Sequence, residues 1–122
     1  MEKTRVVIVD DSRDAANLMA HVIELNDMTA QVCDTTEQAI AFKPNAALID
    51  LNLRNSAMDG FEFASIIRQA CGDKVMLIAF TGLIDVDASQ LLAAGFNNIL
   101  YKPVNVEQVI DMIVKETPMP IH

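Results

Sequence analysis

The stretch VVIVDD at residues 6–11 joins four β-branched residues directly to a pair of aspartates. A run that is β-branched at every position is typical of a central strand buried on both faces, because a strand with one wet face alternates with polar residues. Asp10 and Asp11 then lie where this strand ends. The stretch therefore predicts a parallel sheet with an acidic group at its carboxyl edge.

Three further apolar runs end on a polar residue in the same way: residues 46–49 before Asp50, residues 76–80 before Thr81, and residues 99–101 before Lys102. The carboxyl ends of parallel strands share one edge of a sheet. Side chains that are far apart in the sequence are therefore expected to meet in one crevice. Three carboxylates, one hydroxyl and one ammonium group would form this site.

Strand and helix patterns alternate along the chain. The expected strands cover residues 6–9, 29–33, 46–49, 74–80 and 97–101, and the expected helices cover residues 12–25, 35–42, 59–71, 85–94 and 105–115. Five repeats of strand and helix with right-handed crossovers predict an α/β fold, a doubly wound, flavodoxin-like, five-stranded parallel sheet of order 2-1-3-4-5. That order makes the first and third strands neighbours, so Asp10 and Asp11 should lie beside Asp50.

The length of 122 residues matches a single domain over residues 1–122, in which residues 117–122 form a short tail or the stub of a linker. A formal net charge of -8 argues against direct nucleic-acid binding, which depends on Lys and Arg at phosphates. No apolar stretch has the length of a membrane span and no secretory signal precedes Asp10. We therefore expect a soluble, cytoplasmic protein without membrane contact.

Cys33 and Cys71 are isolated from each other and from any histidine cluster. Their spacing matches neither a zinc site nor a disulfide framework. They are expected to be reduced thiols.

The predicted crevice suits a hard divalent cation, because clustered carboxylates repel one another and Mg²⁺ prefers oxygen ligands. Asp11 and Asp50 would bind Mg²⁺ directly, the backbone carbonyl of Asn52 would complete the protein ligands, and Asp10 would act through water. Each residue taken singly has an ordinary explanation, such as a helix cap or a turn. Independent caps, however, have no reason to occupy all four strand ends around one crevice.

A carboxylate beside such a cation can also attack phosphorus and form an aspartyl phosphate. Asp50 is the candidate nucleophile because it is central in the predicted site. Thr81 and Lys102 could bind phosphoryl oxygens, and Gly82 would leave room for the phosphoryl group.

The chain resembles the receiver domain of two-component response regulators over essentially its whole length. The resemblance rests on these motifs: Val-Asp10-Asp11-Ser, Leu-Ile-Asp50-Leu-Asn52, Asp59-Gly60, Phe-Thr81-Gly82, Ala-Gly95 and Lys102-Pro103. It implies that Asp50 takes a phosphoryl group from a histidine kinase and that Asp10 and Asp11 hold Mg²⁺. It also implies that Thr81 and Lys102 sense the phosphoryl group and that a cis peptide joins Lys102 to Pro103.

The expected function is a phosphorylatable signalling switch and not a classical enzyme, with self-phosphorylation from a donor and slow self-dephosphorylation as its only reactions. The surface of the fourth helix, fifth strand and fifth helix would change partners on phosphorylation. Expected partners are a histidine kinase or phosphotransfer protein, a protein target or missing output domain, and a second copy in a phosphorylation-dependent homodimer.

Two departures from the family pattern affect this expectation. The loop at residues 53–58 lacks the usual proline and is about two residues longer. Ile99 stands where the family commonly has an aromatic switch residue, so coupling through Thr81 is in question. Tyr101 shares the strand parity of Ile99 and is either a substitute for it or an exposed packing residue.

Three other functions remain open at this stage. A Mg²⁺-dependent aspartyl-phosphate phosphohydrolase would need a second acid two residues after Asp50, where Asn52 stands instead. A phosphorylation-independent interaction module would keep the fold without using the site. A flavin-binding protein of the same topology is disfavoured, because Asp10 and Asp11 would repel a phosphate.

Overall fold

The computed structural model describes residues 3–53, 58–82 and 85–115. Strands and helices alternate along this part of the chain: β1 (Arg5–Val9), α1 (Arg13–Leu25), β2 (Thr29–Val32), α2 (Thr36–Ala41), β3 (Ala46–Asp50), α3 (Gly60–Cys71), β4 (Met76–Thr81), α4 (Ala88–Ala94), β5 (Asn98–Tyr101) and α5 (Val106–Lys115). The repeat of strand and helix predicted from the sequence is confirmed.

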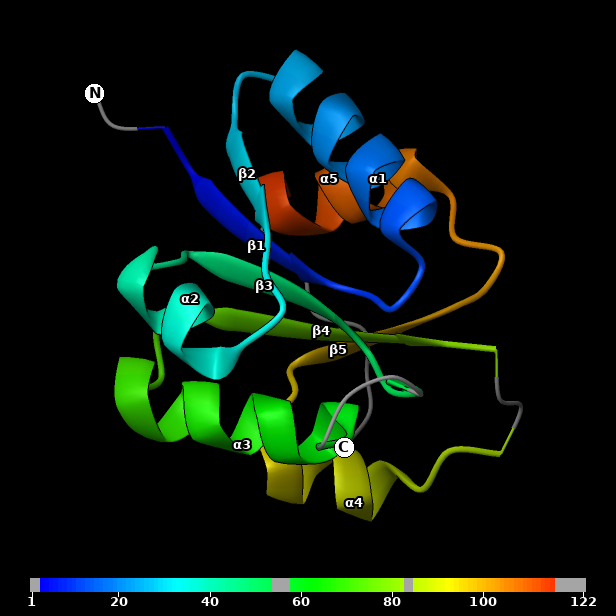
Figure 1. Cartoon of the computed structure of the whole chain (residues 1–122). Coiled ribbons are helices and arrows are strands. Elements are labelled where there is room, and N and C mark those ends of the chain that lie inside the picture. The colour runs from blue at the N-terminus through cyan, green and yellow to red at the C-terminus, as the bar shows by residue number, and fades with distance from the viewer. Residues whose placement is uncertain (1–2, 54–57, 83–84, 116–122) are drawn as a thin grey trace.

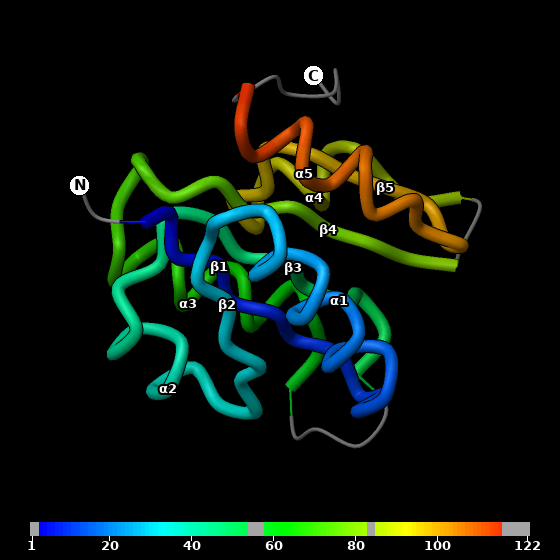
Figure 2. The backbone as a smooth tube through the Cα atoms, turned by 90° about the horizontal axis from the view of Figure 1, so that it is seen from above, coloured from blue at the N-terminus to red at the C-terminus, as the bar shows by residue number. Residues whose placement is uncertain are grey.

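The five strands are parallel and lie in the order β2-β1-β3-β4-β5, as predicted. Helices α1 and α5 cover one face of the sheet, and α2, α3 and α4 cover the other (Figure 1). Seen from above, α1 and α5 lie across the near face of the sheet (Figure 2). The sheet is therefore covered by helices on both faces.

The side chains of β1 alternate between two cores. Val7 and Val9 pack with residues of α2, α3 and α4, whereas Val6 and Ile8 pack with residues of α1 and α5. Burial on both faces explains why this strand is β-branched throughout. A strand held in this way fixes where the following aspartates lie.

Two element boundaries differ from the sequence-based expectation by two residues or more. The fourth strand begins at Met76 and not at Lys74, and the preceding Val75 carbonyl accepts a hydrogen bond from Nη1 of Arg68 at 2.8 Å. The fourth helix begins at Ala88 and not at Asp85. Its N-cap is Asp87, whose carboxylate accepts a hydrogen bond from the backbone nitrogen of Ser89 at 2.8 Å.

Within the described residues, every helix is too short or too polar to cross a bilayer. The predicted long loop at residues 53–58 lies largely outside the described part, which lacks residues 54–57. The predicted tail at residues 117–122 lies wholly outside it.

Candidate functional site

The carboxyl edge of the sheet brings predicted site residues together. Val9 of β1 pairs with Ile49 of β3. The next residue on each chain segment is an aspartate, so Asp10 and Asp50 lie side by side. The carboxyl ends of β1, β3 and β4 point the same way, to the right in Figure 1. The parallel topology therefore creates the common edge that the sequence predicted.

Lys102 joins two of the acidic side chains. Its Nζ lies 2.8 Å from Oδ2 of Asp50 and 3.9 Å from Oδ2 of Asp10. The side chains of Asp50 and Asp10 are only 5% and 6% exposed, whereas that of Lys102 is 38% exposed. Lys102 thus supplies the positive charge for two buried carboxylates and remains accessible from solvent.

Backbone amides fix the orientation of both carboxylates. Oδ1 of Asp50 accepts a hydrogen bond from the backbone nitrogen of Asn52, and Oδ1 of Asp10 accepts one from that of Ser12, both at 2.9 Å. Each aspartate therefore has one oxygen held by the following loop and one directed towards Lys102. Such fixed hydrogen bonds hold the carboxylates in place before any ligand arrives.

Gly60, at the start of α3, lies against the backbone that carries Asp50. A Cβ atom at this position would collide with the Asp50 carbonyl oxygen and lie 2.7 Å from Cα of Leu51. The absence of a side chain allows the helix to approach the strand end closely. The start of α3, with Asp59 as N-cap, thus holds Leu51, the residue directly after the candidate nucleophile: the Gly60 nitrogen donates a hydrogen bond to the Leu51 carbonyl oxygen at 3.4 Å.

Burial raises the pKa of the Asp10 carboxyl above its ordinary value near 3.8. The neighbouring carboxylate of Asp50 raises this pKa further, whereas the Ser12 amide and Lys102 lower it. Negative charge at Asp10 is therefore only partly compensated, and an added cation would stabilise it.

Thr81 lies at the end of β4 and is fully buried. Its carbonyl oxygen accepts a hydrogen bond from the backbone nitrogen of Lys102 at 2.8 Å, so β4 and β5 are still paired where Lys102 begins. The Lys102-Pro103 peptide bond is cis, as the resemblance implied. Thr81 thus lies on β4, the strand next to the one that carries Asp50. Its proposed contact with a phosphoryl oxygen stays a prediction.

Asp11 lines a cavity of about 350 Å³ beside the site, together with Asp10, Arg13, Asp34 and Leu53. Asn52 is exposed, and its backbone nitrogen is directed to Asp50. The proposed metal-binding roles of Asp11 and of the Asn52 carbonyl remain predictions.

The donor atoms of this site match a hard cation. Asp10 and Asp50 offer carboxylate oxygens close to each other, and Mg²⁺ commonly takes one or two carboxylates and keeps several waters. Among the described residues, no group of three or more histidines, cysteines or carboxylates could by itself hold a metal ion. The residues fit a half-open magnesium site better than a closed structural metal site.

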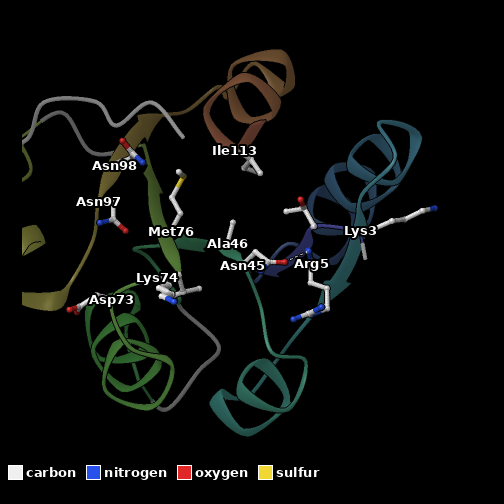
Figure 3. A pocket seen from close by; sticks show the side chains of 12 residues that line it. Lys3, Arg5, Asn45, Ala46, Asp73, Lys74, Met76, Asn97, Asn98 and Ile113 are labelled. Carbon is white, nitrogen blue, oxygen red and sulfur yellow. Dashed lines mark hydrogen bonds between the residues drawn. The ribbon is translucent and has the colours of Figure 1, made fainter. Parts of the chain in front are cut away.

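A larger cavity of about 440 Å³ lies at the opposite, amino edge of the sheet (Figure 3). Its asparagines hold the strand starts: Oδ1 of Asn45 accepts from the backbone nitrogen of Arg5 at 2.7 Å, and Oδ1 of Asn97 accepts from that of Leu77 at 2.9 Å. In Figure 3 Lys3 extends away from these strand starts. The buried carboxylates of Asp10 and Asp50 and the ammonium of Lys102 lie at the carboxyl edge, so we assign the candidate site to that edge, beside the smaller cavity.

Both cysteines are free, as predicted. Burial, followed by the charge of Asp34, raises the pKa of the Cys33 thiol to about 11. This thiol is therefore protonated at neutral pH and inert as a nucleophile.

Sequence reasoning missed three residues around the site. The ring centroid of Phe80 lies 5.2 Å from Nζ of Lys102. Arg13 forms an ion pair with Asp34 at the cavity wall. Phe80 pairs with Leu100, and Lys102 lies two residues further on the same side of the chain. Comparing neighbouring strands residue by residue could therefore have predicted the ring of Phe80 near Lys102. The pairing of Arg13 with Asp34 depends on side-chain conformation, for which the sequence carries no signal.

Comparison with known proteins agrees with the geometry. A family model described as response regulator receiver domain matches residues 6–114. The nitrogen assimilation regulatory protein NtrX of Azorhizobium caulinodans is 27% identical over 110 residues, which cover 86% of this chain and 24% of that protein. The chain therefore spans about a quarter of that curated relative.

Two solved structures share the fold. A receiver domain protein (CheY-like) from Methanospirillum hungatei has a TM-score of 0.82 at 22% identity and covers 94% of each chain. The second is the receiver domain of a Saccharomyces cerevisiae response regulator, crystallised with its histidine phosphotransfer signalling protein. The matched chain has a TM-score of 0.77 at 21% identity, covering 93% of this chain and 88% of the other.

Proposed function

Because this chain belongs to the response regulator receiver domain family, we propose that it is a phosphorylatable switch in which Asp50 accepts the phosphoryl group. The observation that carries the proposal is the contact of buried Asp50 with Nζ of Lys102 at 2.8 Å, beside Asp10. A buried carboxylate with a cation at hand is suited to become a phosphorylated group, because the cation can neutralise the charge that the phosphoryl oxygens add.

In the proposed reaction, a carboxylate oxygen of Asp50 attacks the phosphorus atom of a phosphohistidine. The new O–P bond forms as the P–N bond breaks, and the histidine nitrogen keeps the electron pair and takes up a proton. Lys102 would then exchange its contact with the Asp50 carboxylate for a phosphoryl oxygen. The Thr81 hydroxyl would donate a hydrogen bond to another phosphoryl oxygen.

Asp11, Asp50 and the Asn52 carbonyl would hold Mg²⁺ directly, and Asp10 would act through water. When bound, Mg²⁺ would neutralise charge on the transferred phosphoryl group. The raised pKa of Asp10 supports this assignment, since burial, and after it the Asp50 carboxylate, disfavour its charged form, which a nearby cation would favour.

The proposed output surface is formed by α4, β5 and α5. Leu92, Tyr101 and Val114 are large apolar side chains exposed on these elements. Ile99 is 4% exposed and packs in the core with residues of α3 and α4, whereas Tyr101 is 48% exposed. We propose Tyr101, and not position 99, as the aromatic residue of β5 that responds to phosphorylation.

The proposed partners are a histidine kinase or phosphotransfer protein upstream and a protein target, an output domain or a second copy downstream. The yeast receiver domain that shares the fold is crystallised with a phosphotransfer protein, which supports the upstream partner by analogy. The net charge of -8 speaks against direct binding to DNA by this domain.

Labelling with radioactive acetyl phosphate and Mg²⁺ tests the phosphoacceptor. The native chain should take up acid-labile label that hydroxylamine also removes, and Asp50→Asn should take up none. Asp111→Asn removes the same charge from an exposed position of α5 and should label like the native chain. Label that persists in Asp50→Asn would assign the nucleophile elsewhere.

The same preparation separates the alternatives. Turnover of a phosphomonoester at enzymatic rates would favour the phosphohydrolase, whereas slow loss of label from Asp50 is expected of the switch. A native chain that binds its partner but takes up no label would favour the phosphorylation-independent interaction module.

A further inference from the structure

Arg13 occupies an unfavourable position for a cation. It is the first residue of α1, where the partial positive charge of the helix end disfavours a positive side chain. Asp14, the next residue, has the charge that a helix start favours. Packing does not account for Arg13 either, because 61% of its side chain is exposed. The stability of α1 therefore does not explain why this position carries an arginine, and a role in binding is the alternative.

Asp34 holds Arg13 in place. Nη2 of Arg13 lies 3.2 Å from Oδ1 and 3.1 Å from Oδ2 of Asp34. The backbone of Asp34 is fixed in turn, because its nitrogen donates to Oε1 of Gln38 at 2.7 Å. The Asp34 side chain is 62% exposed, so the ion pair lies in water and is weak enough to exchange partners.

The pair forms part of the wall of the cavity beside the phosphorylation site. This cavity is lined by Asp10, Asp11 and Asp34, and Arg13 is the one cation among the described residues that line it. Asp10 joins this cavity to the phosphorylation site, because it contacts the same Lys102 Nζ as Asp50 does. A negatively charged phosphodonor that approaches Asp50 from this side passes these carboxylates. Without a cation at the wall, their repulsion would lower the donor's affinity.

We propose that Arg13 is the residue that positions anionic phosphodonors at this site, and that Asp34 binds its guanidinium until a donor enters. When a donor enters, the guanidinium exchanges the Asp34 carboxylate for an oxygen of the donor's phosphate. No covalent bond changes in this step. The inference rests on the proposed phosphorylation of Asp50 and adds a determinant of donor affinity to it.

Acetyl phosphate is the probe, with the rate of Asp50 labelling measured against its concentration at fixed Mg²⁺. Arg13→Gln should raise the half-saturating concentration by roughly threefold to fivefold and leave the maximal rate unchanged. Asp34→Asn should lower the half-saturating concentration by a similar factor, because it releases the guanidinium. Both effects should shrink as salt is added.

The double variant separates an exchange of partners from a general charge effect. If Asp34 acts only by holding Arg13, Asp34→Asn should change nothing once Arg13→Gln is present. If Asp34→Asn lowers the half-saturating concentration equally in both backgrounds, the carboxylate acts by general repulsion and the proposal is overturned. A change confined to the maximal rate would overturn it as well.

Two controls complete the test. Asp111→Asn removes one negative charge on α5 and should leave the half-saturating concentration unchanged. Thermal unfolding of each variant should remain close to that of the native chain, since the pair is exposed. If the native chain takes up no label, the proposed function fails. If it labels normally and Arg13→Gln has no effect, only the role of Arg13 fails.

Discussion

The carboxylate of Asp10 is 6% exposed, and its charge is opposed by burial and by Asp50 more than it is supported by Ser12 and Lys102. The folded state therefore binds the Asp10 proton more tightly than the unfolded state does. For a group with a raised pKa, the stabilising effect is complete below the unfolded value, here about 3.8, and is lost as the pH rises through the folded value. At neutral pH the ionised Asp10 consequently lowers stability.

Asp10→Asn should therefore stabilise the protein at pH 7 by on the order of 1 kcal/mol, a size common for relief of an active-site conflict. The advantage over the native chain should grow as the pH rises above about 3.8 and then level off. Urea unfolding measured between pH 4 and pH 7 checks the sign. An advantage that shrinks with rising pH would contradict the raised pKa of Asp10.

At sufficient concentration, Mg²⁺ should make the native chain more stable to urea unfolding than Asp10→Asn. A ligand that binds only the folded state adds stability that grows with its concentration, and Asp10→Asn should lose part of that gain. Asp111→Asn, on the exposed face of α5, should respond to Mg²⁺ as the native chain does.

At the residue level, the sequence predicted those site positions that depend on topology alone. Asp50 and Thr81 end β3 and β4, and Asp10 and Lys102 directly follow β1 and β5. The strand order therefore brings all four to one edge whatever their side-chain conformations. The contact of Arg13 with Asp34 also needs particular conformations of two exposed side chains, and hydrophobic periodicity carries no information about these.

Among the elements, the end of α3 is joined to β4 and to the turn after α4 by one side chain. Arg68 donates hydrogen bonds to the carbonyl oxygens of Gly95, Gly72 and Val75 and to Oδ1 of Asn97, at 2.6–3.1 Å. Asn97 itself accepts from the backbone nitrogen of Leu77. This network fixes the starts of β4 and β5 with respect to α3.

Arg68→Met should destabilise the protein by about 2 kcal/mol or more, because it leaves several part-buried acceptors without a donor. Arg68→Lys should recover little of the loss, since a compact ammonium cannot reach acceptors spread around a planar guanidinium. Chemical unfolding midpoints measure both effects. Lys74→Met, which removes an exposed cation near the start of β4, is the matched control and should change stability by less than about 0.5 kcal/mol.

The same network explains part of what sequence patterns could not predict about the elements. Val75 continues the apolar run of β4, yet its carbonyl oxygen accepts a hydrogen bond from Arg68. The start of α4 was missed for a different reason. Asp85 and Asp87 are equally good N-caps, and only the structure shows that Asp87 caps Ser89.

Across the whole molecule, Lys102 connects the site to the proposed output surface. Its Nζ contacts Asp50 of β3, while its backbone directly follows Tyr101 of β5. Any movement of Lys102 towards a phosphoryl group must therefore act on the chain next to the exposed ring of Tyr101. The proposed switch can therefore connect Asp50 to Tyr101 through Lys102, and this connection can be measured directly.

The chain contains no tryptophan and a single tyrosine, so its intrinsic fluorescence reports Tyr101 alone. Beryllofluoride with Mg²⁺, a mimic of the phosphoryl group, should change this emission in the native chain because Lys102 leaves Asp50. Asp50→Asn should show no change with the same additions, and Asp111→Asn should respond like the native chain. If beryllofluoride binds, as seen by protection of Asp50 from labelling, and Tyr101 emission stays constant, then the site is not coupled to β5. In that case Ile99 has replaced the aromatic switch without a substitute at Tyr101, and the output must leave by another surface.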